Sequence, residues 1–124
     1  MALKKCACID TLYTELPFEE RLAAARRDGF DGVDFWDWWP HDICRLRDAA
    51  DACGIRINSF DGDAGYSLVD PDQRGLYLDF LGGSLEAAKV LGAESLSAII
   101  VYYKLICNTY NTYSSMYTKI DCIQ

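Results

Sequence analysis

Apolar and polar positions along residues 5–103 follow two spacings, one typical of strands and one typical of helices. Short apolar runs predict strands at 5–9, 32–36, 55–60 and 96–103. Between these runs apolar side chains recur every three or four residues, which predicts helices at about 17–28, 42–53 and 70–91. Strands and helices therefore alternate, and this β-α-β-α-β-α-β order predicts an α/β fold with four parallel strands.

The ends of the predicted helices are marked by glycine and by residues that cap helices. Each helix stops before a glycine that can adopt the left-handed conformation, at Gly29, Gly54 and Gly92. Asp42, or His41 itself, is predicted to cap the second helix. Asp70 is predicted to cap the third, with Pro71 in its first turn and Gln73 completing a capping box.

One face of each predicted helix is apolar and is expected to pack on the sheet. These positions are Phe18, Leu22 and Ala25, then Ile43, Leu46, Ala50 and Cys53, then Leu78, Leu81, Leu85 and Ala88. The pair Gly82-Gly83 is expected to weaken or bend the third helix, because each glycine costs about 1 kcal/mol relative to alanine.

The composition changes near residue 97. All nine glycines, three prolines, three tryptophans and five phenylalanines lie before residue 93, whereas residues 98–124 hold five of the eight tyrosines. We interpret residues 1–97 as one domain and 98–124 as the end of the fourth strand plus a divergent tail, produced by a frameshift, a retained intron or an alternative end. An uninterrupted reading frame with matching codon usage on both sides would refute this origin. Residues 106–120 fit either an amphipathic helix or irregular chain.

Charge and cysteine usage exclude several function classes. The chain has 12 basic and 19 acidic side chains, a net charge of −7, and no basic patch for nucleic acid or an anionic membrane. No stretch approaches the ~20 apolar residues of a membrane span, and no signal peptide is recognised, so we expect a cytoplasmic protein. The six cysteines lack a Cys-x₂-Cys pair and predict thiols, not a zinc site. Cys6 and Cys8 share one strand face, which we expect to be the core.

Candidate chemistry gathers where three predicted strands end. In parallel α/β folds ligands bind at the carboxyl ends of the strands, and here these ends are acidic and aromatic. We predict a polar pocket with aromatic walls for a small hydroxylated molecule, lined by Asp34, Trp36, His41 and Asp61. Three tryptophans at 36, 38 and 39 cannot all face one way on a strand, so at least one must lie near the surface or line a cleft.

Each candidate also has a structural interpretation. A histidine at a helix start is typical of a cap or a surface residue, and Asp61-Gly62-Asp63 has the chemistry of a turn. A cation site built from Asp10, Asp34, Asp37 and Asp61 is a further alternative, which we rank last.

The ordered series of segments resembles the start of the hydroxypyruvate isomerase group, one of the xylose-isomerase-like sugar isomerase and epimerase barrels. The matching segments are 8–21 (CIDTLYTELPFEER), 24–36 (AARRDGFDGVDFW), 52–55 (ACGI), 70–74 (DPDQR) and 86–94 (EAAKVLGAE). The resemblance covers about residues 3–97. It implies the N-terminal half of a TIM barrel, since a complete (β/α)₈ barrel takes roughly 250 residues.

The resemblance also implies an activity. Such barrels interconvert small hydroxy-aldehydes and ketones, with a divalent metal, Mg or Mn, polarising substrate oxygens while a glutamate moves a proton through an enediolate. The family's metal ligands, two glutamates, an aspartate and a histidine, come from later strands, and residues 98–124 contain neither glutamate nor histidine. We therefore assign no catalytic residue, metal ligand or cofactor to this chain, and only Asp34 takes a family position, an acidic one.

Two functions remain open at this point. The leading interpretation is an isomerase half barrel that binds a small hydroxy-carbonyl or sugar-like substrate but is inactive alone. The alternative is a non-catalytic α/β module that binds a small ligand or pairs with another half barrel. Because the first and fourth strands of a half barrel are open edges and its inner face is uncovered, we expect self-association.

Overall fold

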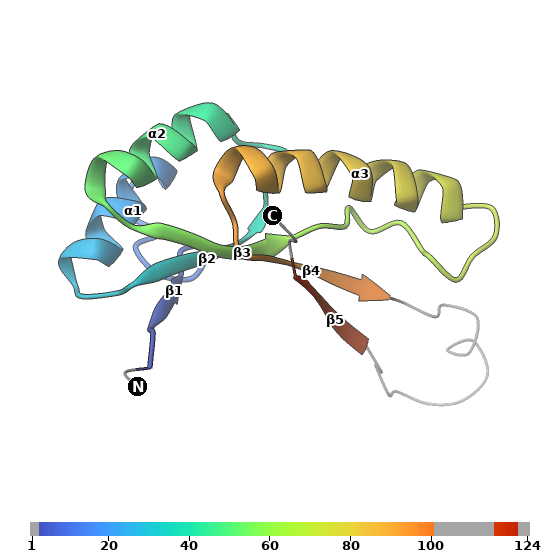
Figure 1. The fold of residues 1–124 in the computed structure, drawn as a ribbon, viewed down its shortest axis with the longest axis horizontal. Coiled ribbons are helices and arrows are strands. Elements are labelled where there is room, and N and C mark those ends of the chain that lie inside the picture. Colours follow the sequence, from blue (N-terminus) through green and yellow to red (C-terminus); the bar gives the residue numbers. More distant parts are fainter. Residues whose placement is uncertain (1–2, 101–115, 122–124) are drawn as a thin grey trace.

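The computed structural model describes residues 3–100 and 116–121 of the 124-residue chain. Within them, a five-stranded sheet carries three helices on one face (Figure 1). The strands are β1 (Cys6–Cys8), β2 (Gly32–Asp37), β3 (Arg56–Asp61), β4 (Ser95–Ile100) and β5 (Met116–Asp121), and the helices are α1 (Phe18–Arg27), α2 (Ile43–Cys53) and α3 (Arg74–Leu91). β1 to β4 are parallel neighbours, as the sequence predicts.

The predicted ends of α1 and α2 are confirmed. Gly29 follows α1 with a φ of 86°, and Gly54 ends α2 with a φ of 69°, both in the left-handed region. At the start of α2 the carboxylate of Asp42, not His41, accepts hydrogen bonds at 3.1 Å from the N–H groups of Cys44 and Arg45. None of the helices within the described ranges is long and apolar enough to cross a membrane.

The third helix differs from its prediction in two ways. It begins at Arg74 rather than Asp70, and a turn at 71–73 precedes it, in which the Asp70 carboxylate accepts a hydrogen bond from the N–H of Asp72 (3.0 Å), the contact expected of a cap. It also turns a different face to the sheet, since Leu78 and Leu85 are exposed. The buried positions are Tyr77, Ser84, Ala87, Ala88 and Leu91. Ser84 can occupy this face because its hydroxyl is hydrogen-bonded.

The core lies between the helices and one face of the sheet. The strand residues that pack against the helices are Ala7, Val33, Phe35, Ile57, Phe60 and Leu96, together with Ile9 just after β1. Cys6 and Cys8 are half-buried on the opposite, helix-free face, so the prediction that they face the core is wrong. Ala7 and Ile9 take the core positions instead. The cysteines within the described part of the chain are free thiols, as predicted, at positions 6, 8, 44 and 53.

β5 lies in the segment expected to be helical or irregular, and both expectations are wrong for residues 116–121. It pairs antiparallel with β4, from Ser95 opposite Asp121 to Ile100 opposite Met116. Residues 116–121 include aromatic and β-branched side chains, which are typical of strands. Their backbone groups pair with those of β4, whose edge would otherwise be free. β4 is therefore not the open edge that the half-barrel interpretation expects. The last part of the predicted fourth strand, 101–103, lies outside the described residues, and the origin of the tail stays a prediction.

Candidate functional site

The carboxyl ends of β1 and β2 are joined by one hydrogen bond. Asp10 follows β1, and its Oδ2 accepts a hydrogen bond from the backbone N–H of Trp36 at 2.6 Å. Trp36 lies in an irregularity of the pairing with β3, where the register shifts between Phe35 and Asp37. Such bulges re-aim side chains at the ends of strands. The Trp36 side chain is 51% exposed and free to meet a ligand.

His41 lies in the loop between β2 and α2 and is half-buried. Its ring stacks on Phe18, with the ring centroids 3.8 Å apart and the planes inclined by 11°. Burial lowers the pKa of His41, and the negative charges of Asp10, Glu19 and Asp37 oppose that shift. At neutral pH the imidazole is therefore uncharged, with one nitrogen as a hydrogen-bond donor and one as an acceptor.

Asp61 ends β3 and is bound to the neighbouring strand, because the Ser97 hydroxyl donates a hydrogen bond to its carboxylate. Burial raises the pKa of Asp61, and the Ser97 hydrogen bond opposes the rise. The charges of Asp63, Asp37 and Asp10 raise it further. The negative charges of Asp10 and Asp37 thus raise the pKa of both His41 and Asp61. We call Asp10, Trp36, His41 and Asp61 the strand-end site.

Trp38 fastens the loop after β2 to α3. Its indole Nε1 donates to Ser84 Oγ at 2.8 Å, and the Ser84 hydroxyl donates in turn to the carbonyl oxygen of Gly62, also at 2.8 Å. The N–H of Gly62 donates to the Ser97 carbonyl at 2.7 Å, so the chain stays extended and the turn predicted at 61–63 is not formed. Trp39 is 41% exposed, which confirms that a tryptophan lies near the surface.

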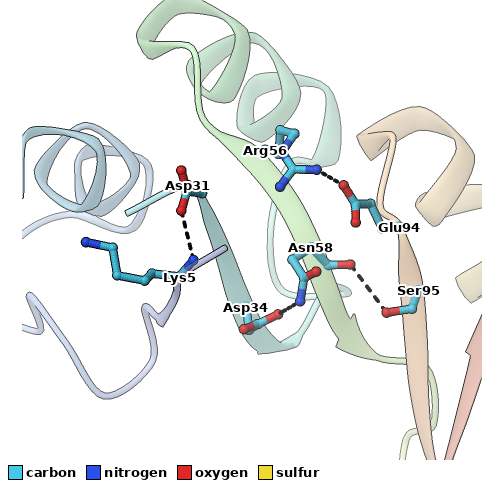
Figure 2. A network of polar contacts seen from close by, with 7 residues as sticks. All are labelled: Lys5, Asp31, Asp34, Arg56, Asn58, Glu94 and Ser95. Atoms are coloured by element: carbon cyan, nitrogen blue, oxygen red, sulfur yellow. Dashed lines mark hydrogen bonds and ion pairs between the residues drawn. The ribbon is translucent and has the colours of Figure 1, made fainter. Parts of the chain in front are cut away.

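Asp34 lies earlier in β2, on the helix-free face of the sheet. Its Oδ1 accepts hydrogen bonds at 2.6 Å from Asn58 Nδ2 and from Ser59 Oγ. Figure 2 shows the Asp34 and Asn58 side chains directed at each other from neighbouring strands. Farther toward the amino ends of the strands, the ion pair between Arg56 and Glu94 links β3 to the start of β4. Asp34 therefore lies in a polar network of the sheet, with Asn58 and Ser59 as its partners, and a shared pocket with Trp36, His41 and Asp61 stays a prediction.

Arg21 belongs to the site and was missed by the sequence analysis. Its guanidinium donates from Nε to the Leu16 carbonyl (3.0 Å), from Nη1 to the Ile9 carbonyl (2.9 Å) and from Nη2 to the Thr14 carbonyl (3.4 Å). The signal available was an arginine three residues after Phe18 and one before Leu22, at the border of the apolar side of a predicted helix, where its stem can pack on the core.

The described residues do not fit the divalent metal that the family resemblance implies. Across residues 3–100 and 116–121, no group of three or more His, Cys, Asp or Glu side chains could hold a metal ion. The alternative cation site is therefore not formed from Asp10, Asp34, Asp37 and Asp61. The reason is visible in the contacts, since Asp10 binds the Trp36 N–H while Asp34 binds Asn58 and Ser59.

Comparison with solved structures identifies the architecture. The crystal structure of an AP endonuclease of family 2 from Brucella melitensis matches with a TM-score of 0.69 and 21% identity, over 79% of this chain and 41% of that chain. The chain has the fold of part of a TIM barrel. A xylose isomerase-like TIM barrel/4-hydroxyphenylpyruvate dioxygenase fusion protein matches with a TM-score of 0.64 and 20% identity, over 77% of this chain and 16% of that chain.

These similarities concern the fold, because proteins of one fold perform many unrelated reactions. The chain spans less than half the length of either matched protein. No protein family matches the chain by its sequence profile, and no curated protein matches it. The prediction of part of a TIM barrel is thus confirmed for the fold.

Proposed function

We propose that this chain is the substrate-binding half of a xylose-isomerase-like barrel related to the hydroxypyruvate isomerases, and that it binds a small, sugar-like hydroxy-carbonyl compound. The convergence of the strand-end site carries the proposal. One hydrogen bond joins the Asp10 carboxylate to the backbone N–H of Trp36. The negative charges of Asp10 and Asp37 raise the pKa of both His41 and Asp61 against or along with the effect of burial. This is the end of the sheet at which barrels of this kind bind their substrates.

The electrostatics of the site favour an uncharged ligand. Burial raises the pKa of Asp61, and the negative charges of Asp63, Asp37 and Asp10 raise it further. A ligand carboxylate would add a further like charge, whereas the hydroxyl groups of a neutral sugar can donate to the carboxylates. The exposed Trp36 ring offers an apolar face on which a sugar-like ligand can stack. Dihydroxyacetone, the neutral counterpart of hydroxypyruvate, has this chemistry.

The proposal assigns binding to this chain and no chemical step. Proton transfer in the family goes with a divalent metal, and the described residues provide no group that fits one. The non-catalytic alternative, a module that binds a small ligand, is therefore favoured over autonomous isomerisation. DNA is the competing ligand, since one structural neighbour is an AP endonuclease. The net charge of −7 disfavours it, because phosphate binding depends on basic side chains.

Calorimetric titration of the purified chain with dihydroxyacetone and with hydroxypyruvate tests the proposal. We expect saturable binding of dihydroxyacetone, weaker binding of hydroxypyruvate, and loss of binding in Asp61→Ala. Asp48→Ala, which removes an exposed carboxylate in the middle of α2, is the matched control and should bind normally. Binding of neither compound, or tighter binding of a DNA duplex, would refute the proposal. Isomerase turnover in Mg²⁺ or Mn²⁺ above a metal-free control would show that catalysis, too, resides in this chain.

A further inference from the structure

We infer that Arg21 is the positioning residue of the strand-end site. A single guanidinium sets both the loop that carries Asp10 and the phenyl ring on which His41 stacks. This inference rests on the proposed function, because it says how the chain keeps its binding groups in place before a ligand arrives.

The first contact is with the loop between β1 and α1. Arg21 donates to the carbonyl of Ile9, immediately before Asp10, and to the carbonyl of Leu16, immediately before the N-cap of α1. A third bond reaches Thr14 between them. The two ends of the loop are therefore held to one rigid group, and Asp10 leaves that anchor in a fixed direction toward the N–H of Trp36.

The second contact is with Phe18, one helical turn before Arg21. The Arg21 Cζ lies 5.4 Å from the centroid of the Phe18 ring, a cation–π arrangement. The same ring stacks on His41 and meets Phe35 of the core edge-on at 5.8 Å. Phe18 is thus held between the core and the arginine, and His41 takes its orientation from Phe18.

The geometry requires arginine and not merely a positive charge. Three donors on one planar group reach three carbonyl oxygens that face different parts of the loop. The ammonium of a lysine is a compact point charge on a flexible stem, without the planar surface for Phe18 or the same fixed fork of donors. Arg21→Lys therefore removes the positioning while it keeps the charge.

The test uses the only histidine of the chain as a spectroscopic reporter. We expect the ring current of the stacked Phe18 to shift the Hε1 proton of His41 upfield, and the bond to Asp10 to shift the amide proton of Trp36 downfield. In Arg21→Lys we expect both signals to move toward unstructured values and dihydroxyacetone affinity to fall about tenfold. Arg47→Lys is the matched control. Arg47 also donates to a backbone carbonyl, that of Leu91 at 2.8 Å, but it joins α2 to α3 away from the site.

A second variant separates the two contacts. Phe18→Leu keeps the bonds from Arg21 to the loop, so it should move the His41 signal and leave the Trp36 amide signal in place. The inference is overturned if Arg21→Lys leaves both signals unchanged, or if Arg47→Lys moves them as much. Absence of ligand binding to the wild-type chain, together with the expected signal changes, would refute the proposed function and leave the positioning role of Arg21 standing.

Discussion

The Asp10 carboxylate accepts a hydrogen bond from the backbone N–H of Trp36 at 2.6 Å, between the loop after β1 and the end of β2. The pairing of β1 with β2 ends at Cys8 opposite Asp34, two residues before Trp36, so the Trp36 N–H takes its acceptor from the Asp10 side chain. A side chain from the first strand end thereby fixes the backbone of the second.

Asp10→Ala should lower the free energy of unfolding by about 1–3 kcal/mol, since it leaves the N–H of Trp36 without an acceptor. Asp10→Asn retains an acceptor oxygen and should cost less. Urea denaturation followed by tryptophan fluorescence measures both. A loss in Asp10→Ala no larger than in Asp48→Ala would show that this hydrogen bond does not contribute to stability.

Asp61→Asn should stabilise the protein at pH 7. Burial raises the folded-state pKa of Asp61, so its stability contribution is complete below the unfolded value of about 3.9 and is lost as the pH rises through the folded pKa. Asparagine keeps an acceptor for Ser97 and has no such loss. The unfolding free energies of mutant and wild type, compared at pH 7 and at about pH 3.5, should differ only at the higher pH. Equal differences at both would contradict the assignment.

The contribution of His41 to stability should have the opposite pH dependence. Burial lowers its folded-state pKa, so the contribution of His41 is complete above the unfolded pKa of about 6.5 and is lost as the pH falls through the folded pKa. A proton NMR titration of this single histidine should give a midpoint below that of a free histidine. His41→Gln should also lack the decline in stability that wild type shows over this interval. A midpoint at or above the free value would be incompatible with the buried, stacked ring.

Two neighbouring positions of α3 should respond with opposite signs. Ser84→Ala leaves the Trp38 indole N–H and the Gly62 carbonyl without their partner, which should cost about 1–3 kcal/mol. Gly82→Ala, where an added Cβ meets nothing within 4 Å, should gain up to about 1 kcal/mol from helix preference. Thermal unfolding monitored by circular dichroism measures both. A destabilised Gly82→Ala would mean that the helix is strained there.

The parallel strands and their helices could be predicted from the spacing of apolar residues and from the glycine and capping residues at the helix ends. Gly54 and Asp42 mark the ends of α2 because a left-handed glycine and a capping carboxylate are local requirements that the sequence displays. The prediction failed where long-range partners decide. Ser84 can be buried in α3 because it is hydrogen-bonded to Trp38 and Gly62. These partners are far away in the sequence, so the local pattern of α3 does not predict them. β5 likewise exists through its pairing with β4, which spacing within residues 116–121 does not encode.

The candidate site was likewise predicted only where local sequence signals were enough. Trp36, His41 and Asp61 could be named because they lie at or just after the carboxyl ends of strands, and these ends meet at one edge of a parallel sheet. Asp34 was grouped with them as part of the acidic end of the second strand and by its place in the family resemblance, yet its carboxylate is bound by Asn58, a partner in another strand. Arg21 was missed because its role lies in three backbone carbonyls of a folded loop.

The most direct test of the central claim is a titration of the chain with dihydroxyacetone, followed through the NMR signals of His41 and the Trp36 amide. Binding at the strand-end site predicts saturable shifts of both signals with one common dissociation constant, and a weaker response to hydroxypyruvate. Unchanged signals throughout the titration, or an equal response in Asp61→Ala, would contradict it.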